Sequence, residues 1–275
     1  TVTDANGCSF VVSGNISQPS TLTASAVEGA ISCNGGTTTV TITATGGTAP
    51  YSNDGVHTVS AGAYSFTVTD ANGCSFVVSG NISQPSTLTA SAVEGSIDCN
   101  GGTTTVTITA TGGTAPYSND GVHTVSAGAY SFTVTDANGC SFVVSGNISQ
   151  PSTLTASAVE GSIACNGGST TVTITATGGT APYSNDGVHT VSAGAYSFTV
   201  TDANGCSFVV SGTISQPSSL SASAVEGAIG CNGGTTTVTI TATGGTAPYS
   251  GDGVHTVSAG AYSFTVTDAN NCSFT

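Results

Sequence analysis

Short segments of the chain alternate strictly between apolar and polar residues. Residues 104–111 (TTVTITAT) place Val, Ile and Ala on one face and Thr on the other, which is the pattern of a β-strand with one buried face. Residues 129–136 (AYSFTVTD) alternate in the same way, and an Asn138-Gly139 turn then leads into the apolar segment 140–148. No segment has helical periodicity. The pattern therefore predicts an all-β protein built from antiparallel strands.

The whole pattern recurs every 66 residues. The segment TVTDANGCSF begins at Thr1, Thr67, Thr133 and Thr199, and the variant TVTDANNCSF begins at Thr265. Each copy contains about six predicted strands, enough for a small antiparallel sandwich of the immunoglobulin-like type. The fold class that we expect is a tandem array of small antiparallel immunoglobulin-like β-sandwich repeats.

The repeat also sets the expected domain boundaries. These are the C-terminal part of a truncated repeat (1–18), three immunoglobulin-like repeats (19–84, 85–150 and 151–216) and a repeat truncated at its last strand (217–275). Both ends interrupt a structural unit and would leave strand edges unpaired, so we interpret the chain as a stretch of a longer array. The alternative is that broken ends of neighbouring molecules complete each other by strand donation.

The charge balance excludes several classes of function. The chain has no Lys and no Arg, 14 acidic residues and a formal charge of −14. A nucleic acid or an anionic membrane surface would repel it, and a Walker-type nucleotide site or a Schiff base needs a side chain that it lacks. The longest apolar runs are far shorter than a membrane span requires. We expect neither nucleic acid as a partner nor a membrane span in this segment.

The cysteines fall into two series that recur with the repeat. One series follows the predicted hairpin turn (Cys8, Cys74, Cys140, Cys206, Cys272), and the other precedes an Asn-Gly-Gly turn (Cys33, Cys99, Cys165, Cys231). Two distant cysteines per copy are typical of a disulfide framework, whereas a zinc site usually has close Cys-x-x-Cys spacing. Disulfides imply an oxidising, extracellular compartment.

The pairing depends on the number of strands. With six strands joined by simple hairpins, both cysteine turns lie at the same pole of a copy, and about one strand fits between Tyr51 and Tyr64. This favours pairing within copies, with Cys8 left unpaired by truncation (Cys33–Cys74, Cys99–Cys140, Cys165–Cys206, Cys231–Cys272). With seven strands or one crossing connection, the turns lie at opposite poles, too far apart for a disulfide, and Cys33 would pair with Cys140 of the following copy. A third option is Cys74–Cys99.

The histidines and carboxylates are the candidates for chemistry. Each copy has one His beside Ser and Asp residues such as Ser52 and Asp54 (His57, His123, His189, His255), but the context of a nucleophilic serine is missing, so we expect no catalytic residues and no enzyme. Calcium could bind between units through Asp54, Asp70 and Glu28. Turn formation by Asp and Asn side chains explains the same residues without an ion, and we expect no metal and no other cofactor.

Asparagine sequons offer one further kind of modification. Asn15, Asn81 and Asn147 begin Asn-Ile-Ser sequons and Asn271 begins Asn-Cys-Ser, while Thr213 interrupts the series. Such a sequon marks a site where a glycan can be attached in a secreted protein.

Three motifs in a fixed order resemble a known family. They are CNGGTTTVTITATGGTAPY (Cys33–Tyr51), AGAYSFTVTDANGC (Ala61–Cys74) and ISQPSTLTAS (Ile82–Ser91), and together they resemble the SprB-type repeats of Bacteroidota surface adhesins over essentially the whole chain. The resemblance implies a very large, secreted cell-surface protein with immunoglobulin-like units, linked to adhesion and in some members to gliding, and exported by the type IX system. The longer stretch that usually follows Pro-Tyr is reduced here to SNDGVHTVS.

These observations predict a structural and adhesive extracellular repeat protein, acting as a stalk or filament shaft on a bacterial surface. Its expected partners are neighbouring copies of itself and surface glycans. The alternative is a multivalent array of glycan- or calcium-binding adhesin modules, in which weak binding by each unit becomes strong binding by the array.

Overall fold

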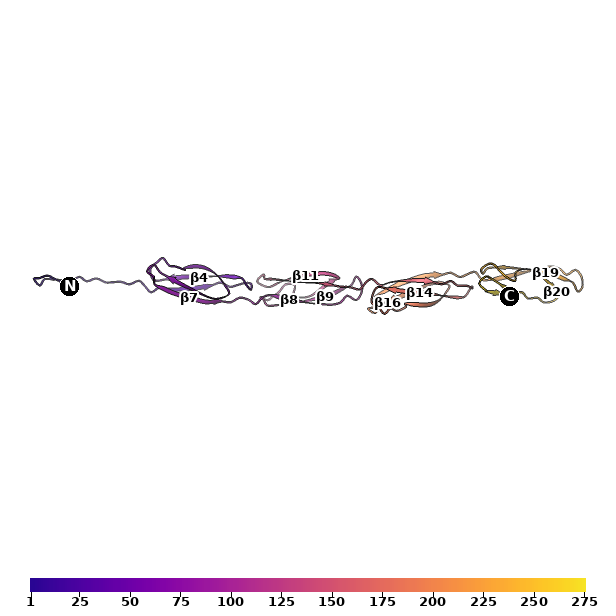
Figure 1. Cartoon of the computed structure of the whole chain (residues 1–275), viewed down its shortest axis with the longest axis horizontal. Helices are drawn as coiled ribbons and strands as arrows, with labels where there is room; N and C mark the ends of the chain where they lie inside the picture. Colours follow the sequence, from indigo (N-terminus) through magenta and orange to yellow (C-terminus); the bar gives the residue numbers. More distant parts are fainter. The chain divides into compact units, whose positions relative to one another are not determined.

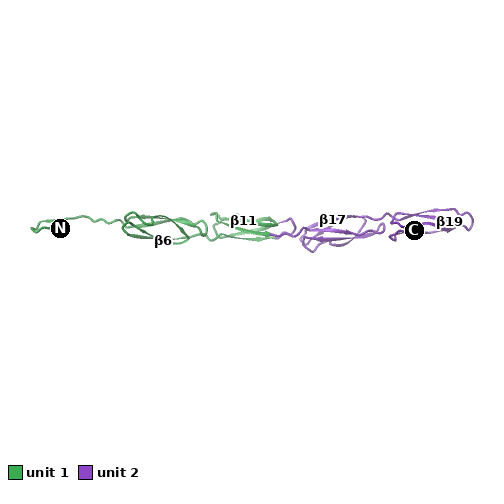
Figure 2. Cartoon of the chain, turned by 45° about the horizontal axis from the view of Figure 1, so that its top comes forward, with its two compact units in different colours: residues 1–95, 105–147 green, residues 96–104, 148–275 purple.

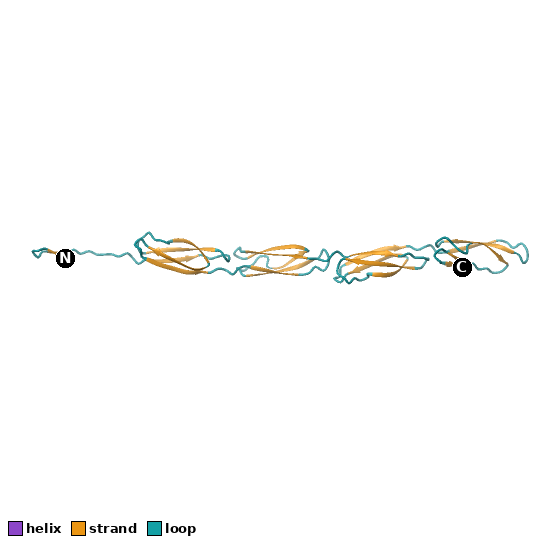
Figure 3. Ribbon diagram, in the orientation of Figure 1, coloured by secondary structure: helices purple, strands orange, loops and turns teal.

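The computed structural model describes residues 1–275 and is all-β, with antiparallel strands and no helix (Figure 3). The chain forms two compact units, coloured separately in Figure 2. The first unit comprises residues 1–95 and 105–147, and the second comprises residues 96–104 and 148–275.

The strands of the first half begin with a short hairpin and continue as two sets of five (Figure 1). The hairpin consists of β1 (Val2–Thr3) and β2 (Ser9–Phe10). The first set is β3 (Thr23–Glu28), β4 (Thr37–Thr45), β5 (Gly55–Ser60), β6 (Gly62–Thr69) and β7 (Ser75–Ile82). The second set is β8 (Thr89–Glu94), β9 (Thr103–Thr111), β10 (Gly121–Ser126), β11 (Gly128–Thr135) and β12 (Ser141–Ile148).

The second half has one further set of five and a shorter final set. The complete set is β13 (Thr155–Glu160), β14 (Ser169–Thr177), β15 (Gly187–Ser192), β16 (Gly194–Thr201) and β17 (Ser207–Ile214). The final set is β18 (Ser221–Glu226), β19 (Thr235–Thr243), β20 (Gly253–Ser258), β21 (Val266–Thr267) and β22 (Ser273–Phe274).

Each set of five divides into a three-stranded and a two-stranded sheet. In residues 19–84, β4 lies between β3 and β5, while β6 and β7 form a separate hairpin in continuous register from Gly62↔Ile82 to Thr69↔Ser75. A single bridge, Ser52↔Thr69, joins the segment before β5 to β6. The alternating segments 104–111, 129–136 and 140–148 become β9, β11 and β12, so the strand predictions are confirmed. The expected sixth strand is absent, because the short Pro-Tyr-Ser segment contributes only that bridge.

The hydrophobic core of residues 19–84 contains side chains from both sheets. Val40 and Ile42 of β4 are buried together with Val68 of β6 and with Val78 and Ile82 of β7. The corresponding cluster in the second unit has seven buried residues (Leu154, Ile163, Val172, Ile174, Val200, Val210, Ile214). The inward positions of these strands carry the buried Val and Ile side chains, whereas the outward positions carry most of the Thr side chains and a few exposed valines such as Val27 and Val56. A small core therefore joins the two sheets.

Candidate functional site: the junction between consecutive copies

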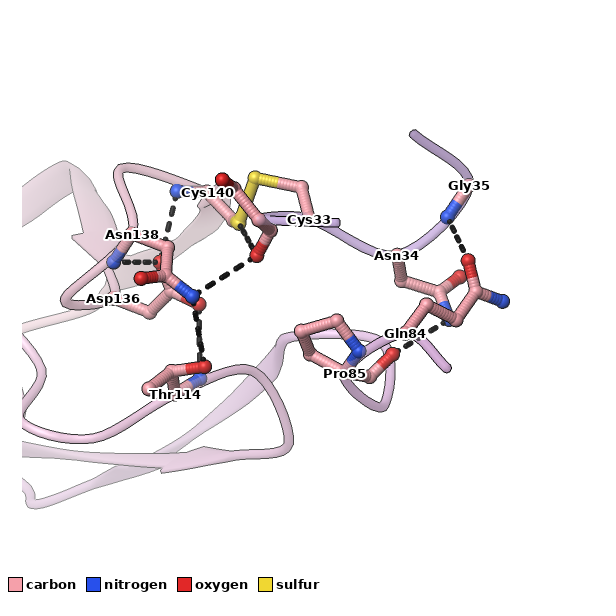
Figure 4. Close-up of a disulfide and its surroundings, with 10 residues drawn as sticks. Cys33, Asn34, Gly35, Gln84, Pro85, Thr114, Asp136, Asn138 and Cys140 are labelled. Carbon is pink, nitrogen blue, oxygen red and sulfur yellow. Dashed lines mark hydrogen bonds between the residues drawn. A yellow bond between two sulfur atoms is a disulfide. The ribbon is translucent and has the colours of Figure 1, made fainter. Parts of the chain in front are cut away.

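A disulfide joins Cys33 to Cys140 of the following sequence copy (Figure 4). We call its surroundings the junction: residues 32–35, the linker residues 84–85 and the turn 136–140. The Cα atoms of the two cysteines lie 5.7 Å apart, within the range that a disulfide requires. Buried Ile31 anchors the turn that presents Cys33, and Gly36 N–H donates to the Cys33 carbonyl over 3.0 Å. The junction is therefore held at one end by the core of residues 19–84.

The linker is fixed to the same turn by amide groups. Asn34 Nδ2 donates to the Pro85 carbonyl over 2.9 Å, and Gly35 N–H donates to Gln84 Oε1 over 2.7 Å. Gly35 has a φ of +78°, a conformation that glycine adopts without strain. These two bonds fix the chain at the point where it passes from one copy to the next.

The turn that presents Cys140 is organised by Asp136, a buried side chain. Its Oδ1 accepts hydrogen bonds from the N–H groups of Asn138 and Cys140, both over 2.9 Å, and its Oδ2 accepts from Thr114 N–H over 2.9 Å. Asn138 Nδ2 donates to the Ser32 carbonyl over 3.1 Å and to Thr114 Oγ1 over 3.0 Å. Asn138 thus connects the turn directly to the neighbouring copy (Figure 4).

The hydrogen bonds to Asp136 stabilise its charged form. Burial opposes ionisation, but the N–H groups of Thr114, Cys140, Asn138 and Gly139 together lower the pKa of the Asp136 carboxyl below its ordinary value. Asp70, Asp202 and Asp268 occupy the same position in their turns, and their carboxyl pKa values are also lowered. The turns therefore depend on the carboxylate form of these side chains.

Replacing this carboxylate should weaken the turn in a pH-dependent way. In Asp136→Asn, the amide cannot accept from all three N–H groups, and we expect the melting temperature at pH 7 to fall by about 5–10 °C. A carboxyl whose pKa is lower in the folded state stabilises the fold above its ordinary pKa of about 4 and loses this effect as the pH falls through the folded value. The gap between wild type and variant should therefore close in acid, as measured by thermal unfolding between about pH 2 and pH 7.

The matched control for this variant is Asp120→Asn. Asp120 is an exposed turn residue, and its Oδ1 accepts only from Ala110 N–H, over 2.9 Å. We expect a smaller change at neutral pH, because fewer N–H groups lose a partner and water can reach them. Equal effects of the two substitutions, or a gap for Asp136→Asn that does not narrow in acid, would contradict the role given to Asp136.

The second unit contains two further junctions with the same contacts. Cys99 pairs with Cys206 and Cys165 pairs with Cys272. The linker carbonyls of Pro151 and Pro217 accept from the side chains of Asn100 and Asn166 (both 2.9 Å), and Asn204 and Asn270 donate to the carbonyls of Asp98 and Ala164 (both 3.0 Å). The residues at 32, 98 and 164 differ in side chain, and the junction uses only their backbone carbonyls. These contacts are therefore compatible with any side chain at this position.

The observed pairing corrects the one favoured from the sequence. Cys33–Cys74, Cys99–Cys140, Cys165–Cys206 and Cys231–Cys272 are not formed, and the pairing between copies takes their place. Each copy has five strands instead of six, so the chain changes direction one time fewer between its two cysteine turns. These turns therefore lie at opposite poles of the copy. Cys8, Cys74 and Cys231 are free and exposed, although Cys74 and Cys231 were expected to be bridged.

The histidines take part in local packing. The His57 ring stacks on Phe66 with centroids 4.3 Å apart, and its Nε2 lies 2.9 Å from the carbonyl oxygen of Asn53. Asn53 has a φ of +56°, so the ring supports a turn with a left-handed residue. The same two contacts occur at His123 and His189.

The carboxylates that the sequence singled out have separate partners. Asp54 Oδ1 accepts from Ala44 N–H over 2.9 Å, and Asp70 organises a cysteine turn. Glu28 Oε1 accepts from the Tyr64 hydroxyl over 2.7 Å, and this hydrogen bond raises the pKa of Tyr64. No three His, Cys, Asp or Glu side chains gather into a group that could hold a metal ion.

The junction residues Asn34, Gln84 and Asn138 were missed by sequence reasoning. Asn and Gln are common in turns and linkers, so these residues give no signal of their own. Their hydrogen-bond partners are backbone carbonyl or N–H groups that lie 49 to 106 positions away in the sequence. The only available signal was that Asn-Gly-Gly, Ser-Gln-Pro and Asp-Ala-Asn recur together in the copies. The sequon residues Asn15, Asn81, Asn147 and Asn271 are all exposed.

No protein-family model matches the chain, and no curated protein sequence matches it significantly. The structure contains no helix of the length and apolar character needed to span a membrane.

Proposed function

We propose that this chain is a structural and adhesive extracellular repeat protein that serves as a stalk or filament shaft on a bacterial surface. We further propose that its 66-residue copies are immunoglobulin-like sandwiches, which is supported by the two antiparallel sheets that share one core in residues 19–84. The observation that carries the functional proposal is the disulfide between each copy and the next. A covalent bond between consecutive copies keeps the array joined when it is pulled along its length.

The three disulfide-closed loops overlap along the sequence. Each disulfide spans a sequence separation of 107, and each loop begins before the preceding one ends. Every peptide bond between Cys33 and Cys272 therefore lies inside at least one closed loop. A single backbone cut in this region leaves all parts covalently joined, which would protect a fibre exposed to proteases.

The disulfides also shorten the covalent route through the chain. From Cys33 the route crosses to Cys140, follows about 25 residues of backbone to Cys165, and crosses to Cys272. Most of this backbone is the extended strands β12 and β13. A pulling force along this route acts on covalent bonds and on strands that are already extended. The distance between Cys33 and Cys272 can therefore increase only a little when the copies unfold.

An extracellular location is supported by the same cysteines and by the composition. Disulfides persist in oxidising compartments, and trypsin has no cleavage site in a chain without Lys and Arg. The resemblance to SprB-type repeats supports an adhesive role at the surface. The outward Thr and Ser side chains provide a polar, uncharged face over most of each sheet.

Labelling intact cells of the organism that makes the protein tests this proposal. A short epitope inserted in the exposed turn at Asn119–Asp120 avoids the cores and the junctions. We expect antibody to label the cells without permeabilisation, and Cys33 and Cys140 to resist alkylation until they are reduced. Label seen only after lysis, together with alkylation of both cysteines before reduction, would overturn the proposed location and role.

A further inference from the structure

The asparagines of the junctions lie in a dipeptide that is prone to deamidation. Five of the six are followed directly by glycine (Asn34-Gly35, Asn100-Gly101, Asn138-Gly139, Asn166-Gly167, Asn204-Gly205). In this reaction the backbone nitrogen of the next residue loses its proton and attacks the side-chain amide carbon of Asn. Glycine favours the attack, because it has no side chain to hinder it and its backbone is flexible. Asn34 and Asn138 are exposed, so water reaches the reacting atoms.

The linker holds both reacting groups of Asn34-Gly35. The Gly35 N–H donates to Gln84 Oε1 over 2.7 Å, and Asn34 Nδ2 donates to the Pro85 carbonyl over 2.9 Å. The Gln84 oxygen only accepts, so it stabilises the N–H form of Gly35 and disfavours the deprotonated nitrogen that attacks. The bond to Pro85 restrains the rotation of the Asn34 side chain that the attack requires. The closed junction, in which these hydrogen bonds are formed, therefore slows the reaction at Asn34.

The second reactive pair is restrained from the opposite side of the junction. The Gly139 N–H donates to the Asp136 carbonyl over 3.0 Å, and Asn138 Nδ2 donates to the Ser32 carbonyl and to Thr114 Oγ1. The Asp136 carboxylate accepts from N–H groups of the same turn and repels the negative charge that the attack creates there. Asn138 is therefore also protected while the junction is closed.

The product of deamidation does not fit the junction. A carboxylate takes the place of the amide, so the carbonyls of Ser32 and Pro85 face an oxygen in place of an N–H donor. At position 138 the new negative charge also lies in the same turn as the Asp136 carboxylate. An isoaspartate product adds a methylene group to the backbone as well. The polar contacts of the closed junction cannot form again after either reaction.

We propose that the Asn-Gly pairs of the junctions are deamidation sites that the closed junction protects, and that their reaction opens its hydrogen bonds irreversibly. At Asn34 a bond forms between the Gly35 nitrogen and Cγ, the bond from Cγ to Nδ2 breaks, and ammonia leaves with the proton of the Gly35 nitrogen. Water then adds to one carbonyl carbon of the resulting cyclic imide and opens it to a carboxylate. The Cys33–Cys140 disulfide takes no part, so the copies stay covalently joined.

This inference goes beyond the proposed stalk and does not depend on it. The reaction needs only water and the contacts of the junction, whatever the location of the protein. Cell labelling can therefore succeed where the deamidation test fails, and the reverse.

The third junction shows how the reactive dipeptide can be removed. Asn270 donates to the Ala164 carbonyl and to Thr246 Oγ1, both over 3.0 Å, but Asn271 follows it in place of glycine. Asn271 has a φ of +65°, and a Cβ built on Gly139 would meet no atom within 4 Å. Gly139→Asn should therefore keep the turn and slow deamidation at Asn138 in the denatured chain. Deamidation as fast as in the wild type would show that the next residue is not the attacking group.

Peptide mapping of the oxidised chain during incubation in a mildly alkaline buffer tests the protection. Gln84→Ala removes the acceptor of the Gly35 N–H, and Ser83→Ala changes an exposed neighbour outside the junction contacts. We expect deamidation at Asn34 to become about 5- to 10-fold faster in Gln84→Ala only. The rates at Asn100 and Asn166 in the same molecules should stay at the wild-type value.

A reduced and denatured sample gives the rate without any junction. We expect the pairs of the wild-type junctions to react more than about 10-fold more slowly than in this sample. Wild-type rates equal to those of the denatured chain, or an unchanged rate at Asn34 in Gln84→Ala, would overturn the proposed protection.

Hydrogen exchange tests the consequence of the reaction. Asn138→Asp reproduces one product, whereas Asn147→Asp adds the same charge at an exposed position of β12 outside the junction. We expect the N–H groups of residues 32–36 and 136–140 to exchange about 10-fold faster in Asn138→Asp and at the wild-type rate in Asn147→Asp. Unchanged exchange in Asn138→Asp, or equal effects of the two substitutions, would overturn the proposal that deamidation opens the junction.

Discussion

Pulled from its two ends, the oxidised chain should release far less length than the reduced chain. Between Cys33 and Cys272 the reduced backbone has about 240 residues, or roughly 800 Å when fully extended. With all three disulfides intact, the shortest covalent route has about 25 residues, or roughly 90 Å. Force spectroscopy with and without a reductant measures this difference, because the terminal residues outside Cys33 and Cys272 contribute equally in both states.

The extension also identifies which cysteines are paired. Pairing within copies would give a route of about 75 residues, or roughly 260 Å, since each of the three linkers would have to stretch in series. In a variant with both Cys33→Ser and Cys140→Ser, the shortest route has about 107 residues, or roughly 370 Å. A wild-type extension near the value for pairing within copies, or one unchanged by reduction, would contradict the covalent route described here.

Removing one junction disulfide should strongly destabilise the first unit. The Cys33–Cys140 bond spans a sequence separation of 107, and a loop of that size stabilises the folded state by about 4–5 kcal/mol in the chain-entropy model. We therefore expect the variant with both Cys33→Ser and Cys140→Ser to lose about 4 kcal/mol of unfolding free energy. Guanidinium unfolding followed by circular dichroism measures the loss.

The control for this prediction is a cysteine that forms no bond. Cys8→Ser alters an exposed free thiol and should change the unfolding free energy by less than about 0.5 kcal/mol. A double variant as stable as the wild type would show that the junction disulfide closes no loop in the denatured chain. A Cys8→Ser variant that lost as much stability as the double variant would show that Cys8 is also bridged.

The strands could be predicted because their burial follows their alternation. In β9, Val106 and Ile108 are almost fully buried, whereas Thr105 and Thr109 are exposed, as the alternation in 104–111 indicates. The hairpin of β6 and β7 was equally clear, since an Asn-Gly turn separates two apolar segments. These features are local, and the sequence carries them completely.

The disulfide pairing could not be predicted because it depends on the parity of the strand count. The Pro-Tyr-Ser segment at 50–52 has the residues of a strand but is too short for alternation to decide, and only Ser52 pairs. One strand fewer moves the Cys74 turn to the opposite pole from Cys33. The contacts of Asn34 and Asn138 could not be predicted from the sequence either. Each side chain donates to a backbone carbonyl far away along the chain, and such a contact leaves no pattern in the sequence.

A non-reducing peptide map tests the junction disulfides most directly. The protein is denatured with its free thiols blocked and digested with Glu-C, which cleaves after Glu28, Glu94, Glu160 and Glu226. The structure predicts that all peptides from residue 29 onward remain in one disulfide-linked species until they are reduced, because each disulfide joins two consecutive peptides. Separate peptides 29–94, 95–160, 161–226 and 227–275, each with its own internal disulfide, would contradict the junctions and with them the covalent route on which the proposed stalk rests.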